Sequence, residues 1–174
     1  MVITSRGEGC FKIQSGSVSL AVDAPDNRLK PDIALFTHAL LPLAYNHARP
    51  QDIIGPGEYD IAGVEIEGFP AVASGKTLET VYRVTMEEMT LVFLGNPSKL
   101  PDAAIGEKLG PIDILFAPPG SVKLVKHMVP KITVAAYFKN HKEAEKEFGK
   151  VKEQDKLTVK AKDVPQAAEV IFIS

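Results

Sequence analysis

Short β-prone runs separated by turn residues dominate this sequence, and they limit the folds that are open to it. Near the start, Val2–Thr4, Cys10–Gln14 and Val18–Val22 are such runs, and glycines and serines lie between them. Runs of this length with turn chemistry between them are typical of strands joined by hairpins. The pattern continues, so residues 1–95 are expected to be nearly all β.

Two further hairpins are expected later in this β-rich part. Glu58–Ile61 and Val64–Glu67 flank an Ala-Gly turn, and the alternation places Val64 and Ile66 on the buried face. Thr80–Thr85 and Thr90–Leu94 flank an acidic turn. The stretch 38–57 contains several prolines and glycines and is expected to be irregular.

Further along the chain, continuous apolar runs, in which apolar and polar residues do not alternate, are interspersed with helical patterns. Asp32–Thr37 and Ile112–Ala117 are such runs, which suits strands buried on both faces. Helices are expected over Pro101–Leu109, with the proline at its first position, over Ser121–Met128, and over Asn140–Lys150, with the asparagine as its cap. Two β-rich layers with helices outside would bury these faces. The expected class is therefore α/β or α+β, in one domain that covers residues 1–174.

Composition narrows the functional classes. The 174 residues carry 20 Lys and Arg against 22 Asp and Glu, so no excess of positive charge favours nucleic acid or an anionic membrane. The one cysteine, Cys10, excludes an internal disulfide and is expected to be an inert core residue. No apolar run is long enough to cross a bilayer and no signal peptide is recognisable, so a cytoplasmic location is expected.

A series of motifs, in order along the whole chain, resembles the metallo-β-lactamase superfamily. The motifs are Gly9–Ile13, Val22–Pro25, Asp32–His38, Gly55–Tyr59, Ala62–Val64, Val92–Gly95, Gly110–Phe116 and Asp155–Val159. The resemblance is greatest to a small bacterial branch of zinc-dependent-hydrolase-like proteins, related to L-ascorbate-6-phosphate lactonase. It implies a four-layer αββα sandwich. It also implies hydrolysis of esters, lactones, amides or phosphodiesters by one or two zinc, manganese or iron ions, which activate water.

The main ligand motif of that family, Thr-His-x-His-x-Asp-His, is almost completely replaced here. It aligns with residues 37–43, where only His38 keeps a ligand side chain. Leu40, Pro42 and Leu43 stand at the other three ligand positions, and none of these side chains has a donor atom. The resemblance therefore implies a degenerate metal site.

The remaining ligand positions are replaced as well. Ala73 and Ala136 stand where the family has histidines, and Asn96 stands where it has a bridging aspartate. A neutral amide does not offset divalent charge as a carboxylate does, and a metal site needs three or four donors. We therefore expect no metal ligands, no bound cofactor and no catalytic residues of the family's type.

Four residues are candidates for a relic of the cleft: His38, Asp23, Asn96 and Tyr137. Three of them also have a purely structural interpretation. His38 suits the end of a strand, and Asn96 before a proline suits a turn. Asp23 aligns with a residue that supports the metal ligands in the family, but it also suits a turn or a cap.

Residues 40–44 are apolar where the family has charged ligands. They are expected either to fill the former metal cavity or to form an exposed contact patch. The leading hypothesis is a family member that has lost metal binding and hydrolysis and acts as a binding or assembly module. Its partner would be a second copy or another protein. The alternative is a metal-dependent hydrolase of a lactone, ester or phosphodiester with a reduced or relocated site.

Overall fold

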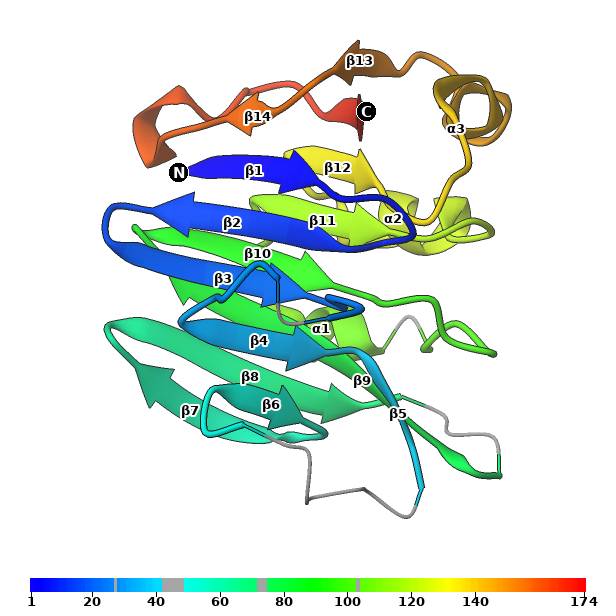
Figure 1. Cartoon of the computed structure of the whole chain (residues 1–174). Coiled ribbons are helices and arrows are strands. Elements are labelled where there is room, and N and C mark those ends of the chain that lie inside the picture. Colours follow the sequence, from blue (N-terminus) through cyan, green and yellow to red (C-terminus); the bar gives the residue numbers. More distant parts are fainter. Residues whose placement is uncertain (27, 42–48, 72–74, 103) are drawn as a thin grey trace.

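The computed structural model describes residues 1–26, 28–41, 49–71, 75–102 and 104–174. Two β-sheets face each other across a common core (Figure 1). The smaller sheet has the order β14 (Leu157–Thr158), β1 (Val2–Ser5), β2 (Phe11–Ser15), β3 (Val18–Val22), β4 (Ile33–Phe36) and β6 (Asp52–Ile54). The larger sheet has the order β13 (Lys152–Gln154), β15 (Glu169–Ile173), β12 (Ile132–Ala135), β11 (Ile114–Ala117), β10 (Met89–Phe93), β9 (Thr77–Met86), β8 (Val64–Pro70) and β7 (Gly57–Ile61).

Each sheet has an antiparallel part and a parallel part. The three predicted hairpins are confirmed as antiparallel pairs of β2 with β3, β7 with β8, and β9 with β10. Strands β1 and β2, and β8 and β9, are antiparallel as well. The strands β3, β4 and β6 are parallel, as are β10, β11, β12 and β15. The two runs without alternation, in β4 and β11, lie within these parallel parts and are mostly buried, which confirms that prediction.

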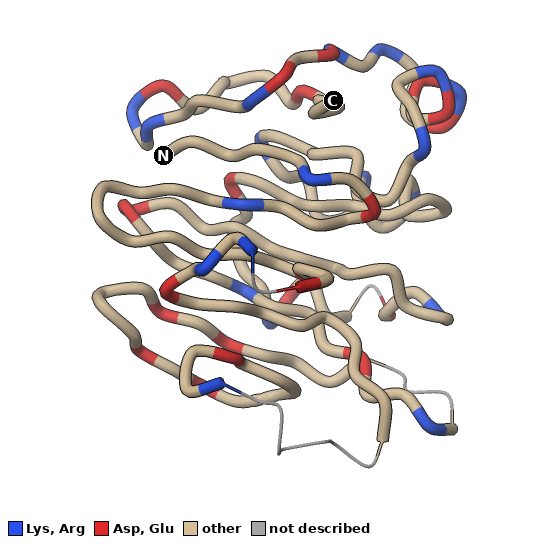
Figure 2. The backbone as a smooth tube through the Cα atoms, viewed as in Figure 1, with Lys and Arg blue, Asp and Glu red and all other residues tan. Residues whose placement is uncertain are grey.

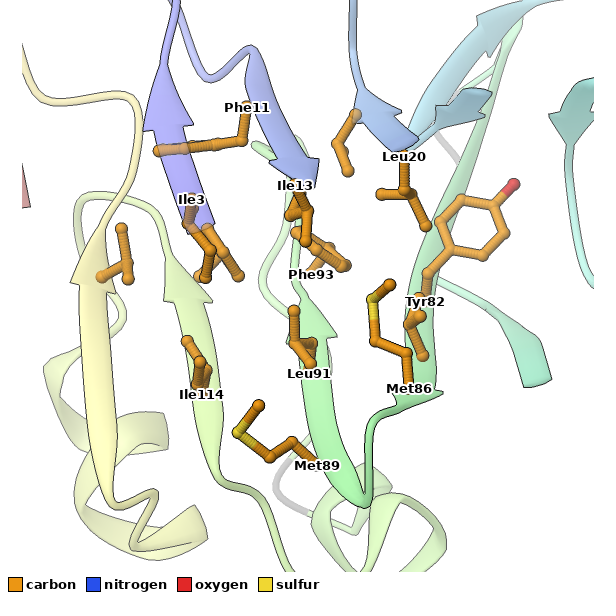
Figure 3. Packing of buried hydrophobic residues seen from close by; sticks show 14 of the residues in the cluster. Ile3, Phe11, Ile13, Leu20, Tyr82, Met86, Met89, Leu91, Phe93 and Ile114 are labelled. Atoms are coloured by element: carbon orange, nitrogen blue, oxygen red, sulfur yellow. The ribbon is translucent and has the colours of Figure 1, made fainter. Parts of the chain in front are cut away.

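The core lies between the two sheets (Figure 3). Ile3, Ile13 and Leu20 of the smaller sheet pack toward Leu91 and Phe93 of the larger one. The Phe93 ring stacks on Phe116 with centroids 4.3 Å apart, and Phe11 meets the edge of Phe116 at 4.8 Å. The Phe11–Phe116 contact joins the two sheets, while the Phe93–Phe116 stack lies within the larger sheet and faces the core.

The α-helices pack on the outer face of the larger sheet. Helices α1 (Ile105–Leu109) and α2 (Val122–Met128) cover the outward side chains of β9, β10 and β11, and α3 (His141–Phe148) covers those of β12 and β15. The outer face of the smaller sheet carries a smaller cluster of Cys10, Ala21 and Ala24 with Leu29 packed against it. The expected sandwich of two sheets with outer helices is confirmed.

The structure confirms the predicted cap of α3 but corrects the start of α1. The Asn140 side chain accepts a hydrogen bond from the Glu143 amide at 3.0 Å. Helix α1 begins at Ile105 and not at Pro101. The Asp102 carboxylate accepts from the Ala104 amide at 3.0 Å, and this local turn uses donors that a longer helix would need.

Two strands were missed because residues 38–57 were expected to be irregular. Strand β5 (His38–Leu40) pairs antiparallel with the start of β9, and β6 (Asp52–Ile54) pairs with β4. Both have three residues, so their pairing depends on neighbours distant in sequence and not on local propensity. Residues 42–48 of this stretch lie outside the described residues.

Charged residues are unevenly distributed over the fold (Figure 2). Acidic residues are concentrated on the β7–β8 hairpin, where Glu58 lies opposite Glu67 and Asp60 lies opposite Glu65 on the neighbouring strand. Both signs occur along α3. Among the described residues, no helix has the length and apolar character needed to cross a membrane.

Candidate functional site

The four residues that were predicted to be a relic of the cleft lie at or just beyond the ends of strands on one side of the sandwich. Asp23 follows β3, Asn96 comes shortly after β10, and Tyr137 comes shortly after β12. His38 begins β5, directly after Thr37 at the end of β4. Because β3 and β4 are parallel, as are β10 and β12 through β11, the carboxyl ends of each set meet at one edge. Ligand sites of α/β sheets commonly lie at such an edge.

Asp23 connects three chain segments at the base of this edge. Its Oδ1 accepts a hydrogen bond from the Thr37 amide at 2.7 Å, and its Oδ2 accepts from the Thr37 hydroxyl at 2.6 Å. The Tyr137 hydroxyl also donates to Oδ2. Asp23 has a φ of 48° and Tyr137 a φ of 65°, which are uncommon for residues other than glycine. Asp23 therefore has a role as a hydrogen-bond acceptor that does not require a metal.

The Tyr137 side chain is held in one position. Burial raises the pKa of its phenol, and the nearby negative charge of Asp23 raises it further. Tyr137 is therefore a protonated donor at neutral pH. A Cβ atom on Gly9 would lie 2.0 Å from the Tyr137 ring, so the ring depends on a glycine in the turn between β1 and β2.

A second close contact joins the two sheets beside this network. Gly95, with a φ of 70°, follows β10, and a Cβ there would lie 2.7 Å from the Cβ and Oγ1 of Thr37. Thr37 is itself buried. The backbone and side chains at the base of the cleft are thus closely packed.

Above this base lies an open cavity of about 460 Å³. Its described lining residues are Glu8, His38, Thr77, Glu79, Asn96 and Tyr137. The structure therefore brings together His38, Asn96 and Tyr137, while Asp23 reaches the cavity through its hydrogen bond to Tyr137. The side chains of His38 and Asn96 are exposed at the rim.

Glu79 is the residue of this cavity that sequence reasoning missed. It lies on β9 opposite His38 of β5, and only 6% of it is exposed. Its carboxylate accepts hydrogen bonds from the Ser98 amide at 3.0 Å and the Ser98 hydroxyl at 3.3 Å. A glutamate at the start of a β-run gave no signal of burial, because the strand that covers it, β5, was itself not predicted. Glu8 was missed too, since it lies in a turn whose position over the cleft is set by tertiary structure.

Two of the apolar residues next to His38 do not fill the former metal cavity, which was one of the two expectations for this stretch. Leu40 is 73% exposed and Leu41 is 41% exposed. The prediction that this stretch fills the former metal cavity is wrong for these two residues, because the backbone pairing of β5 turns them toward solvent. Pro42, Leu43, Ala44 and Ala73 lie outside the described residues.

The described residues do not fit a zinc, manganese or iron centre. Within the described ranges, no three His, Cys, Asp or Glu side chains are grouped so that they could hold a metal ion. The cavity offers one imidazole and two carboxylates, and the Glu79 carboxylate is bound to Ser98. Ala136, which is predicted to align with a histidine of the family, is buried and part of the main core. Cys10 is buried as well and does not line the cavity, and burial raises the pKa of its thiol to about 11, so the free thiol is protonated at neutral pH.

The paired sheets, the outer helices and the cleft at the strand ends define the metallo-β-lactamase fold. The sequence model of the β-lactamase superfamily domain matches residues 2–147, and the chain therefore belongs to this family. No curated protein sequence gives a significant match. The narrower relation to ascorbate-6-phosphate lactonase stays a prediction.

Solved structures agree with this assignment of the fold. A proposed Zn-dependent hydrolase of the metallo-β-lactamase superfamily from Thermotoga maritima is 18% identical, with a TM-score of 0.77 over 99% of this chain and 97% of that one. The metallo-β-lactamase fold protein YhfI from Bacillus subtilis is 13% identical, with a TM-score of 0.62 over 95% and 88%. Igni18, a metallo hydrolase from Ignicoccus hospitalis, is 15% identical, with a TM-score of 0.61 over 79% and 82%.

Proposed function

We propose that this chain is a non-catalytic member of the metallo-β-lactamase fold that acts as a binding or assembly module. The observation that carries the proposal is the donor set of the cleft. In the described residues it contains one histidine, His38, where the fold's chemistry needs three or four ligands around each metal. The cleft has kept its shape and its support, so binding can persist where metal-activated hydrolysis does not.

The retained network at the base supports this proposal. Asp23 accepts hydrogen bonds from the Thr37 amide, the Thr37 hydroxyl and the Tyr137 hydroxyl. In a metal site such a carboxylate would orient a ligating side chain. Here its described partners are a backbone amide and two hydroxyls, and it joins the two sheets instead. The network thus explains why the cleft is retained without its catalytic purpose.

The alternative is a hydrolase with a reduced or relocated site, and one observation favours it. His38, Asn96, Tyr137 and Glu79 converge on an open polar cavity that Leu40 and Leu41 do not fill. Against it, the Tyr137 hydroxyl is committed to Asp23 and the Glu79 carboxylate to Ser98. Neither group is therefore placed as a free general base.

The decisive experiment measures metal content and turnover together. The purified chain is dialysed against zinc, manganese or ferrous ions, analysed by plasma mass spectrometry, and assayed with lactone, ester and phosphodiester substrates. We expect bound metal far below one ion per chain and no turnover above background. An ion in stoichiometric amount together with turnover that a chelator abolishes would establish the alternative.

A separate observation supports an assembly role: Leu40 and Leu41, beside the cleft, are exposed. Contiguous exposed apolar surface marks protein contacts when it is extensive, and these two leucines adjoin each other. We propose a second copy of this chain as the partner. Light scattering across a concentration series should show an oligomer, and Leu40→Ser should weaken it; a strict monomer at all concentrations would remove this part of the proposal.

A further inference from the structure

Strand β7 (Gly57–Ile61) ends the larger sheet, and no other part of the described chain pairs with its outer side (Figure 1). An edge strand directs unpaired backbone N–H and C=O groups away from the sheet, where another strand can bind them. The other strands with a neighbour on one side only, β5, β6, β13 and β14, contain two or three residues, whereas β7 contains five. β7 also lacks the lysine, proline or bulge that commonly blocks such pairing.

The exposed face of the β7–β8 hairpin is acidic (Figure 2). Glu58 lies opposite Glu67 and Asp60 opposite Glu65, and like charges at directly opposite positions destabilise a strand pair. Arg83 of β9 forms an ion pair with Glu67 at 2.8 Å, but within the described ranges no ion pair includes Glu58, Asp60 or Glu65. Carboxylates beside an open edge are therefore left without a cation, at a cost to the stability of the free protein.

We propose that β7 is the docking edge for an extended segment of another protein that carries lysine or arginine at alternate positions. The segment adds a strand beside β7, with its main chain bonded to the main chain of β7 and its basic side chains next to Glu58 and Asp60. In strand addition of this kind, main-chain hydrogen bonds supply affinity and alternate side chains supply specificity. An open groove of about 430 Å³ lies along the hairpin, lined by residues 58–60 and 65–67, and gives those side chains room.

Charge complementarity decides between a second copy of this chain and a basic partner. Two β7 strands paired antiparallel about Tyr59 bring Glu58 of each copy opposite Asp60 of the other, so carboxylates meet carboxylates. None of the other described edge strands is long enough to pair with all five residues of β7. The edge thus repels its own copy while it stays open to a basic strand, which is specificity by repulsion. This surface is separate from Leu40 and Leu41, so the inference does not depend on the proposed function.

The test uses a labelled peptide, Thr-Lys-Val-Lys-Val-Lys-Thr with blocked ends, whose fluorescence anisotropy is followed as the whole chain is added at constant ionic strength. One control peptide replaces each lysine with glutamate. A second keeps the lysines but carries a methyl group on the backbone nitrogens of its central residues, which removes the main-chain donors. We expect saturable binding of the first peptide and binding at least about tenfold weaker for each control. On binding, hydrogen exchange should slow at the amides of residues 57–61.

Matched variants separate binding from stability. Glu58→Gln combined with Asp60→Asn should weaken the lysine peptide by about tenfold, because two charge pairs with the peptide are lost. The same double variant should be slightly more stable to heat than the parent, because it relieves two like-charge pairs. Glu153→Gln is the control, since Glu153 is an exposed carboxylate on β13, the edge strand at the opposite end of the same sheet. It should leave the affinity unchanged.

Each outcome decides for or against the docking edge. Equal binding of the methylated peptide shows attraction to an acidic surface without strand addition, and equal binding of the glutamate peptide shows pairing without charge recognition; either result overturns the proposal. So does a lysine peptide that does not bind, an unchanged affinity in the double variant, or slowed exchange confined to β6 or β13. If the double variant does not fold, as judged by circular dichroism, the two peptide controls decide alone. None of these results concerns metal content or turnover, so this inference and the proposed function fail separately.

Discussion

Strands β3 and β4 are joined at both ends by an aspartate, and the two ends differ in an informative way. At one end Asp32 accepts hydrogen bonds from the Ser19 amide at 2.7 Å and the Ser19 hydroxyl at 2.8 Å. At the other end Asp23 accepts the same pair of bonds from Thr37. Within the described part of the chain, Asp23 alone of the two receives a third bond, from Tyr137 just beyond β12 of the opposite sheet. The same arrangement, an aspartate that accepts from the amide and hydroxyl of a serine or threonine, thus links only β3 and β4 at the exposed end. At the cleft it also links the two sheets.

The residues that hold the base of the cleft in place are therefore different from the residues at its rim that would contact a ligand. The residues that hold the base are buried or half-buried and contact one another across the sheets. His38, Leu40 and Asn96, which are predicted to align with ligand positions of the family, are exposed at the rim. We therefore expect substitutions at the rim to leave the hydrogen bonds of the base intact.

The largest effect is expected for Asp23→Ala. The substitution leaves the Thr37 amide and the Tyr137 hydroxyl without their acceptor, and the free energy of unfolding should fall by about 3 kcal/mol. Asp32→Ala should cost clearly less because its side chain is exposed. Urea unfolding of both variants measures the difference, and equal losses would contradict the distinction between the two ends.

A slightly smaller effect is expected for Gly9→Ala, which tests whether the Tyr137 ring is held by the turn that carries Gly9. The added methyl group meets the ring, so stability should fall by about 2 kcal/mol beyond the cost of a left-handed alanine. Gly16→Ala is the matched control, because Gly16 also has a positive φ but nothing within 4 Å of a Cβ. If thermal or urea unfolding shows the same loss in both variants, the contact with Tyr137 carries no weight.

Tyr137→Phe removes only the bond between the sheets. Asp23 keeps both bonds from Thr37, so a loss of about 1 kcal/mol is expected, the usual contribution of one hydrogen bond. Tyr59→Phe on β7 serves as the control and should change stability by less than about 0.5 kcal/mol. A Tyr137→Phe protein as stable as the parent would show that Asp23 serves β3 and β4 alone.

The smallest effect expected is the loss of the contribution of Asp32 to stability at acidic pH. Hydrogen bonds from the Ser19 side chain and backbone hold the pKa of the Asp32 carboxyl below its ordinary value of 3.8. A depressed pKa contributes stability that is present above pH 3.8 and is lost as the pH falls through the folded-state value. The stability difference between the parent and Asp32→Asn should therefore shrink below about pH 4. A difference that stays constant from pH 6 to pH 3 would contradict this account.

The sequence predicted the hairpins, the buried parallel strands and the cap of α3, because each depends on a local pattern of apolar and turn residues. It also indicated that His38, Asn96, Tyr137 and Asp23 belong to one region. It did not predict β5 or the burial of Glu79, since both arise when a three-residue segment pairs with β9. The short strand has no periodicity of its own, and Glu79 is buried by structure that comes from elsewhere in the chain.

The pairing of β5 has a consequence for how new activities arise on this scaffold. The Thr37 carbonyl accepts from the Thr80 amide at 2.8 Å and the Leu41 amide donates to the Lys76 carbonyl at 2.7 Å, so the main chain on either side of His38 is fixed by β9. Side chains on β5 can therefore be exchanged without moving the chain that carries them. Directed evolution that begins from libraries at positions 38 and 40 would sample new rim chemistry at little risk to folding.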